Sequence, residues 1–325
     1  MKAKALANVY GGKSRFASVY SGYIHELTMK GNADTFIDLF GGGASISIMV
    51  SRLGIFNNIV FNDLNIGMYA LAKTVADYDR CERLVNRILE TEYSEDTFRK
   101  AVDVLTIIKA PDIATQLNNG GIIRMDIEKI RDGLDLFDIH KRIAPKKSIE
   151  DIAYYQWLAS NMSYSGICKT FKRDNDLSTT DLQHTMWNKA ESLLELTADF
   201  EGITIENMSF EDIFEKYKNA NAVWFADPPY LKATRTAKDD TYEWEMTWVD
   251  HLLLINHLMT KERFILCGYD VDKLPDSLPK MIYGRLTSAA CIQKIDLEII
   301  SRGSANRKQT EDDPHETIWM KGEIL

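Results

Sequence analysis

The most specific chemical signal in the sequence is the tetrapeptide Asp227-Pro228-Pro229-Tyr230, which directly follows the apolar run 222–226. Two consecutive prolines fix φ and remove two backbone donors, so the carbonyl groups there can only accept hydrogen bonds. The Asp227 carboxylate is a second acceptor, and the Tyr230 ring offers a flat face on which a base can stack. Two acceptors at fixed geometry suit an amino group, which has two protons to donate. The motif therefore predicts a site that binds and activates an exocyclic amine.

An exocyclic amine on adenine is a poor nucleophile because its lone pair is delocalised into the ring. Accepting both N–H protons would pull the nitrogen towards tetrahedral geometry and localise that lone pair. The nitrogen could then attack a sulfonium methyl group in line, without a covalent enzyme intermediate, and the protein would contribute by positioning and electrostatics. A base inside a duplex is out of reach of such a site, so it would have to be flipped into the pocket.

A glycine turn between an expected strand and an expected helix predicts the cofactor site. The strand at 35–40 runs into Gly41-Gly42-Gly43, where glycines let the backbone approach a ligand and the following helix presents free N–H groups. The turn is not the dinucleotide fingerprint, because Ile46 stands where that pattern needs glycine. Asp38 is unfavourable beside a pyrophosphate but suits a cation. S-adenosyl-L-methionine carries a sulfonium and an ammonium group and no phosphate, and we expect it as the cofactor.

A second acidic residue is placed to bind the ribose of that cofactor. Asp63 ends the next apolar segment and follows Asp38 by 25 residues, which is close to the spacing of about 20 residues expected for this role. A solvated aspartate at a strand end is the alternative interpretation. The combination with the glycine turn favours the ribose contact.

Short apolar runs alternate with helical patterns and predict an α/β fold with a parallel sheet of the Rossmann-like type. The expected strands are 35–40, 58–63, 222–226 and 263–267. The expected helices between and after them are 46–53, 65–76 and 248–259. In such sheets ligands bind outside the carboxyl ends of the strands, where the motifs above lie.

A charged helical stretch interrupts this alternation and predicts an inserted module. Its expected helices are 78–92, 95–109 and 126–142. We place the module at 77–183, with approximate boundaries, and the catalytic domain at 1–76 and 184–325. The last part of the chain is expected to complete the sheet with strands at 281–287 and 316–320, separated by a polar loop at 302–314.

Composition limits the class of protein. The 45% apolar and 27% charged content is ordinary for a globular chain, and neither a secretory signal nor an apolar run long enough to span a bilayer is recognisable. The four cysteines and six histidines lack metal-ligand spacing, so we expect free thiols in a reducing cytosol and no metal.

The net charge of −9 argues mildly against a nucleic-acid partner, but a local basic patch is enough to bind phosphates. A solvated surface is the alternative interpretation of each basic cluster. The candidate DNA-binding residues are Lys141, Arg142, Lys146, Lys147, Lys169, Arg173 and Arg235.

In order along the chain, several motifs resemble those of the Dam-like, or D12 class, DNA adenine-N6 methyltransferases. The stretch 36–43, with sequence FIDLFGGG, is similar to the family's cofactor motif, and the tetrapeptide 227–230 matches its catalytic motif. The segments 10–13 (YGGK), 61–65 (FNDLN), 161–166 (NMSYSG), 267–270 (CGYD) and 316–319 (ETIW) resemble further family elements. Val9 stands where an aromatic residue is common in the family, and Tyr10 is the nearest ring.

The resemblance implies a Rossmann-like catalytic domain, a target-recognition module where the helical insert lies, and methyl transfer to adenine N6 in DNA, with double-stranded DNA as the expected substrate. Asp227, Pro228, Pro229 and Tyr230 are the implied catalytic residues. The expected cofactor-binding residues are Tyr10, Gly12, Lys13, Asp38, Phe40, Gly41, Gly43, Ala44, Ser45, Asp63 and Asp227.

Alternative functions are the same chemistry on cytosine N4 or on RNA adenine, a DNA-binding relative without catalysis, and a nicotinamide-dependent oxidoreductase. The intact motifs at 41–43 and 227–230 argue against a relative without catalysis, and Ile46 together with the motif 227–230 argues against an oxidoreductase. We expect a cytoplasmic enzyme without a membrane partner, for which a cognate restriction nuclease is one candidate partner. The recognised DNA sequence and the oligomeric state are not encoded in any motif that we identify.

Overall fold

The computed structural model describes residues 4–118, 147–173, 178–235, 245–272, 277–297 and 316–322. The chain divides into two compact units, one formed by 1–4, 12–64 and 202–325 and the other by 5–11 and 65–201. None of the described helices combines the length and the apolar character needed to cross a lipid bilayer. All four cysteines carry free thiols.

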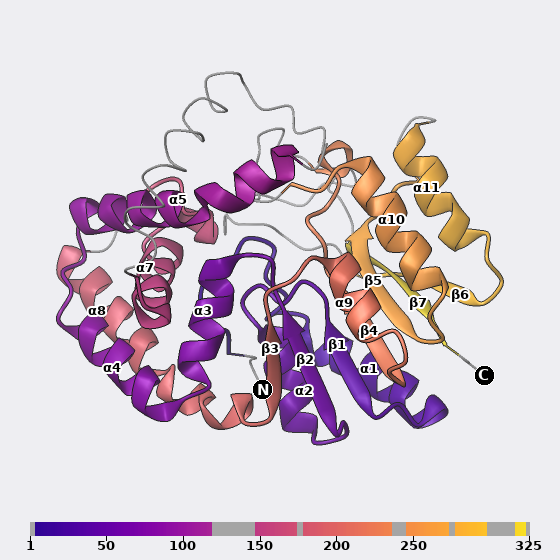
Figure 1. Ribbon diagram of the computed structural model, residues 1–325, viewed down its shortest axis with the longest axis horizontal. Coiled ribbons are helices and arrows are strands. Elements are labelled where there is room, and N and C mark those ends of the chain that lie inside the picture. Colours follow the sequence, from indigo (N-terminus) through magenta and orange to yellow (C-terminus); the bar gives the residue numbers. More distant parts are fainter. Residues whose placement is uncertain are drawn as a thin grey trace. The chain divides into compact units, whose positions relative to one another are not determined.

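The first unit is built on a seven-stranded sheet with the order β3-β2-β1-β4-β5-β7-β6 (Figure 1). The strands are β1 (Thr35–Asp38), β2 (Asn58–Asn62), β3 (Ile203–Glu206), β4 (Ala222–Ala226), β5 (Phe264–Tyr269), β6 (Ile292–Asp296) and β7 (Glu316–Lys321). The first five strands in this order are parallel to one another, whereas β7 runs antiparallel to both β5 and β6. This topology confirms the expected Rossmann-like α/β fold.

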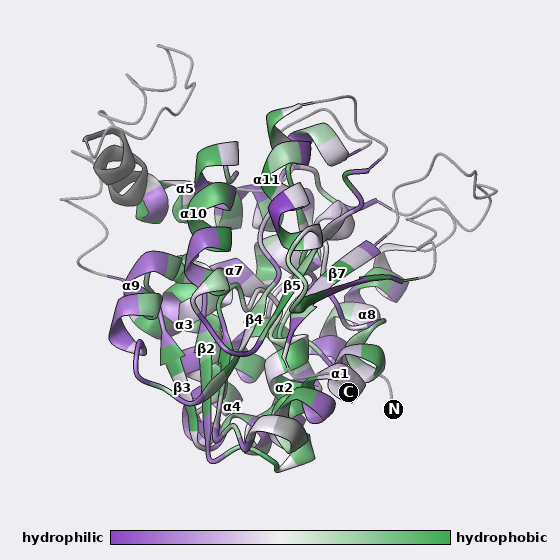
Figure 2. Cartoon of the chain, turned by 90° about the vertical axis from the view of Figure 1, so that its right-hand side faces the viewer, coloured by the Kyte–Doolittle hydropathy of each residue, from purple (hydrophilic) through white to green (hydrophobic). Residues whose placement is uncertain are grey.

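Helices cover both faces of this sheet, and alternate residues of the central strands supply the two cores. One face packs against α1 (Ala17–Gly31) and α2 (Ser45–Leu53), with Val223 and Phe225 of β4 in its core. The other face packs against α9 (Phe210–Lys216), α10 (Trp248–Met259) and α11 (Leu278–Thr287), with Trp224 and Ala226 in its core. The apolar strands therefore lie between layers of amphipathic helices (Figure 2).

The second unit is helical in its described parts. Its α-helices are α3 (Ile66–Val75), α4 (Tyr78–Leu89), α5 (Glu95–Asn118), α7 (Ile149–Asn161) and α8 (Thr179–Glu191). Short 3-10 helices follow at η2 (Tyr164–Gly166), η3 (Leu194–Leu196) and η4 (Ala198–Phe200), and the first unit contains η5 (Lys232–Thr234). The expected helices 78–92 and 95–109 are confirmed as α4 and α5, while 126–142 lies outside the described residues.

Several expectations about the last third of the chain need correction. The segment 281–287, expected as a strand, is part of helix α11, because Pro279 lies in its first turn and Ile282, Tyr283 and Leu286 share one buried face. Strands β3 and β6 were not expected. Both are short edge strands with a weak apolar pattern, so their strand conformation depends on pairing with the neighbouring strand of the sheet. The polar loop 302–314 lies outside the described residues.

Candidate active site

The glycine turn lies at the carboxyl end of β1, as the sequence predicts. Gly41 is packed so closely that a Cβ atom there would lie 2.1 Å from the buried ring of Phe61, so the backbone has no room for a side chain. Gly42 has a φ of +50° and Ala44, the N-cap of α2, a φ of +60°. Left-handed backbone outside glycine is strained, and here it bends the chain into the start of the helix.

Asp38 is the buried acid of this turn. Its side chain is 1% exposed, and Ser47 Oγ donates to its Oδ2 over 2.7 Å. Within the described part of the chain, Oδ1 is buried and has no hydrogen-bond partner. Burial raises the Asp38 pKa to about 7, although the Ser47 hydrogen bond lowers it, and the nearby Asp227 and Asp63 raise it further. A buried acceptor without a donor is costly to a fold, which points to a ligand that supplies the donor.

Asp63 closes the turn from the neighbouring strand. Its Oδ2 accepts a hydrogen bond from the backbone N–H of Gly42 over 2.7 Å, just beyond the end of β2. The neighbouring Asn62 is 1% exposed. Its side chain donates to the carbonyl groups of Leu39 and Met208 and accepts from the Met208 N–H. The ends of β1, β2 and β3 are thus joined by one buried amide side chain.

The motif 227–230 comes directly after β4, which pairs with β1, so this motif and the glycine turn follow neighbouring strands. Lys13 Nζ lies 2.7 Å from Asp227 Oδ1 and 3.3 Å from Glu316 Oε1. The Lys13 side chain is 7% exposed and that of Glu316 is 2% exposed. Burial raises the Asp227 pKa, the Lys13 ammonium opposes that shift, and the Glu316 charge reinforces it.

Tyr230 is buried and contacts Glu316, Tyr269 and Lys13. Its ring is 3% exposed, its hydroxyl donates to Glu316 Oε1, and Tyr269 packs edge-on with ring centroids 4.6 Å apart. The Lys13 ammonium lies 4.8 Å from the centroid of the Tyr230 ring. Burial raises the Tyr230 pKa well above its usual value, so the phenol is protonated and acts as a donor.

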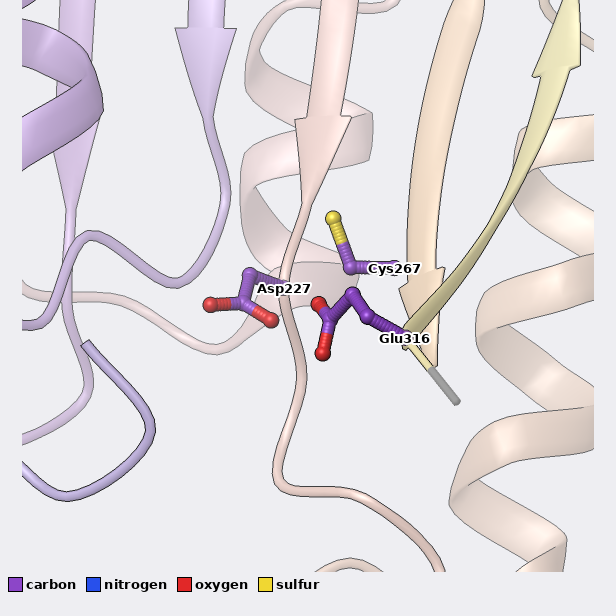
Figure 3. Close-up of side chains that lie close together, drawn as sticks. All are labelled: Asp227, Cys267 and Glu316. Carbon is purple, nitrogen blue, oxygen red and sulfur yellow. The ribbon is translucent and has the colours of Figure 1, made fainter. Parts of the chain in front are cut away.

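Three side chains from neighbouring strands meet at this point, as Figure 3 shows. Asp227 comes just after β4, Cys267 lies on β5 and Glu316 begins β7, and each offers a ligand-type atom within 4.8 Å of the others. Such a group can hold a metal ion, but the Lys13 ammonium already lies between its two carboxylates. One positive charge beside these two acids therefore comes from the chain itself.

The backbone of the motif is fixed by a buried histidine that the sequence did not single out for this role. His251 on α10 is fully buried; its Nε2 lies 3.0 Å from the Pro229 carbonyl oxygen and its Nδ1 lies 2.8 Å from the Tyr283 hydroxyl. Burial lowers the His251 pKa to about 4, so the ring is neutral at neutral pH. Because a carbonyl only accepts, Nε2 carries the proton and the Tyr283 hydroxyl donates to Nδ1.

This arrangement predicts that His251 acts by positioning the motif. His251→Leu leaves the Pro229 carbonyl and the Tyr283 hydroxyl without their partner, and we expect kcat to fall by about 10- to 100-fold with little change in KM for DNA. His251→Gln can still donate to Pro229 and should restore most of the loss. Steady-state methylation kinetics of the two variants measure the difference, and equal kcat values in both would contradict the positioning role.

The remaining candidate residues of the first unit surround the glycine turn and Lys13. Phe40 is half-buried and packs against Phe210, with ring centroids 6.0 Å apart. Gly43, Ala44 and Ser45 are buried at the start of α2, and Gly12 is exposed next to Lys13. Tyr10 belongs to the second unit, so its contact with the cofactor stays a prediction.

The structure gives the basic candidates different surroundings. Arg235 is 7% exposed and its guanidinium pairs with both carboxylate oxygens of Glu245, so it is not a free surface charge. In the second unit, Lys169 is exposed, Arg173 pairs with Glu95, and the Lys147 ammonium lies 5.3 Å from the centroid of the Tyr155 ring. Lys141, Arg142 and Lys146 lie outside the described residues.

Glu316, Tyr20 and His251 are the site residues that sequence reasoning missed. Tyr20 on α1 donates to Glu316 Oε1 over 3.1 Å, and nothing in its sequence context marks it. Glu316 carried a signal, because it is an acid at the start of an otherwise apolar strand, in the segment 316–319 that resembles a family element. No local pattern indicated that β7 would bring this acid back to Asp227.

Comparison with known proteins shows the family of this chain. Among curated proteins, a sequence search returns no match. A family model for the D12 class N6 adenine-specific DNA methyltransferases matches residues 10–264, which include the glycine turn, the acids at the ends of β1 and β2, and the motif after β4. Because the model matches more than half of its length, the chain belongs to the D12 class N6 adenine-specific DNA methyltransferase family.

Proposed function

We propose that this chain transfers the methyl group of S-adenosyl-L-methionine to the N6 amine of an adenine that is flipped out of double-stranded DNA. One observation carries the proposal. The glycine turn after β1, whose buried Asp38 suits a cation, lies beside the motif 227–230 after β4, whose carboxylate and carbonyl groups accept hydrogen bonds. The family assignment gives the reaction class, and the geometry supports the roles of individual residues.

The residues of the turn fit this cofactor. The unpartnered Asp38 Oδ1 suits the ammonium group, and Asp63, which already accepts from Gly42 N–H, suits the ribose hydroxyls. Ala44 N–H already donates to the Gly41 carbonyl, whereas the first-turn N–H groups of α2, which begins at Ser45, have no side-chain cap and suit the carboxylate of the methionyl part. When bound, the cofactor supplies an electrophilic methyl group on a sulfonium.

The chain's own groups would then act on the target amine. Asp227 and the Pro228 carbonyl accept its two N–H protons, which localises the nitrogen lone pair for attack, and His251 fixes the backbone that carries the second acceptor. Asp227 is suited to take the proton that the methylated nitrogen must lose, because burial raises its pKa. Tyr230 provides the stacking surface. A ring that is 3% exposed must first be uncovered, so stacking requires neighbouring side chains to part.

The helical second unit is proposed as the module that recognises the DNA target. The support is its place in the chain between the cofactor turn and the catalytic motif, together with its exposed basic side chain Lys169. Contacts of Lys169 and Arg173 with phosphates would make binding salt-dependent.

Methyl transfer from labelled S-adenosyl-L-methionine to mixed-sequence duplex DNA tests the proposal. The DNA is digested to nucleosides, and we expect N6-methyl-deoxyadenosine by mass analysis. Transfer to cytosine N4, or to RNA and not DNA, would overturn the substrate assignment. Binding of the cofactor is measured in parallel by calorimetry, and a protein without measurable binding would overturn the cofactor assignment.

A further inference from the structure

Glu316 is a buried charge to which the proposed reaction assigns no step. It begins β7, which pairs antiparallel with β5 so that Glu316 lies opposite Tyr269 at the carboxyl end of that strand. Its side chain is 2% exposed. Burying a second carboxylate beside Asp227 is unfavourable unless hydrogen-bond donors or a positive charge compensate it.

One oxygen of Glu316 receives three donors. Tyr20 of α1 and Tyr230 both donate their hydroxyl protons to Oε1, and the Lys13 ammonium lies 3.3 Å from the same atom. Lys13 also lies 2.7 Å from Asp227 Oδ1. The ammonium is therefore shared between two acids, and the three groups together carry a net negative charge when both acids are ionised.

We propose that Glu316 is a positioning residue that shares the Lys13 ammonium with Asp227 and so keeps Asp227 basic enough to accept hydrogen bonds and a proton from the target amine. If Lys13 paired with Asp227 alone, its ammonium would stabilise the ionised carboxylate fully and lower the proton affinity of Asp227. Because the ammonium also pairs with Glu316, this stabilisation is weaker, and repulsion from the Glu316 carboxylate raises the proton affinity of Asp227 further. The direction of the Asp227 pKa agrees, since the Glu316 charge contributes to raising it.

This role rests on the proposed methyl transfer to adenine N6. In that step the nitrogen lone pair forms the new N–C bond, the electrons of the C–S bond stay on sulfur, and the nitrogen becomes positively charged. The methylated amine then loses one proton, which Asp227 accepts. A more basic Asp227 favours that transfer.

The test is the pH profile of the single-turnover methylation rate, with saturating cofactor and DNA, for wild type and Glu316→Gln. The glutamine carbonyl oxygen can still accept from Tyr20, Tyr230 and Lys13, so the variant removes the charge and keeps the packing. Without that charge the proton affinity of Asp227 falls. We therefore expect the acid limb of the profile to move down by about one pH unit, and the plateau rate to fall by about tenfold.

Tyr20→Phe is the matched control, because it removes one donor from Glu316 and leaves the charge in place, so its limb should stay at the wild-type position. Thermal unfolding with bound cofactor checks that each variant is folded. A Glu316→Gln limb that does not move, or one that moves equally in Tyr20→Phe, would overturn this inference. Wild-type protein that forms no N6-methyl-deoxyadenosine at any pH would instead overturn the proposed function, so the two failures are distinguishable.

Discussion

Replacing Asp227 with alanine should abolish methyl transfer, with a loss of at least about 10³-fold in the single-turnover rate. The substitution removes an acceptor for the target amine and the group suited to take its proton. The fold should survive, because Lys13 keeps Glu316 as a partner 3.3 Å away and the buried pair then carries no net charge. Binding of the cofactor should stay measurable by calorimetry, which separates lost chemistry from a lost binding site.

Asp272→Ala is the control for this prediction. Asp272 also lies in the first unit, but its side chain is 59% exposed and pairs with Lys294 on the surface, so its removal should leave the rate within about twofold of wild type. Full activity of Asp227→Ala would show that the motif after β4 does not bind the reacting amine.

Replacing Asp38 with asparagine should weaken binding of S-adenosyl-L-methionine by about 10- to 100-fold. The change keeps the size of the side chain but removes its charge, and hydrogen bonds to charged groups contribute about 1.5–3 kcal/mol. Calorimetric titration measures the effect. Asp34→Asn, just before the start of β1 and exposed to solvent, is the matched control and should bind as wild type does.

Wild type and Asp38→Asn should also differ in the pH dependence of cofactor binding. Burial raises the Asp38 pKa to about 7, and the ionised form is the one that binds a cation. Wild-type affinity should therefore fall by about tenfold between pH 8 and pH 6 as Asp38 takes up its proton, while Asp38→Asn should show no such trend. Parallel pH trends in the two proteins would exclude Asp38 as the ammonium ligand.

Unfolding in urea gives a readout of Asp38 that does not involve the cofactor. The folded protein holds the Asp38 proton up to a pH of about 7, whereas the unfolded chain releases it near 3.8. The stability contributed by the protonated form is complete below pH 3.8 and is lost as the pH rises to about 7. The free energy of unfolding of Asp38→Asn, relative to wild type, should therefore increase between about pH 4 and about pH 7.

The sequence by itself determined the class of fold and the two motifs that carry the chemistry. Gly41, Asp38 and the motif 227–230 are short, local patterns, and a strand that runs into a turn can be recognised because its residues are contiguous. The parallel strands β1, β2 and β4 were expected for the same reason, since each is an apolar run that ends in a polar residue or is directly followed by one. Residues that come directly after a strand along the chain also lie at its carboxyl end in space, so these motifs could be placed at one edge of the sheet.

Only the tertiary structure decided which distant residues complete the site. Glu316 reaches Asp227 because β7 runs antiparallel to β5, and that pairing is not encoded in the six residues of the strand. The helical state of 278–287 depends on packing of one face against α10 and the sheet, which overrides the strand-like composition of its centre. His251 and Tyr20 had no local signal, because an inward-facing polar residue on a helix gains its role from the partner it meets across the core. Long-range contacts, with their burial and charge, set the proton affinities on which this chemistry depends.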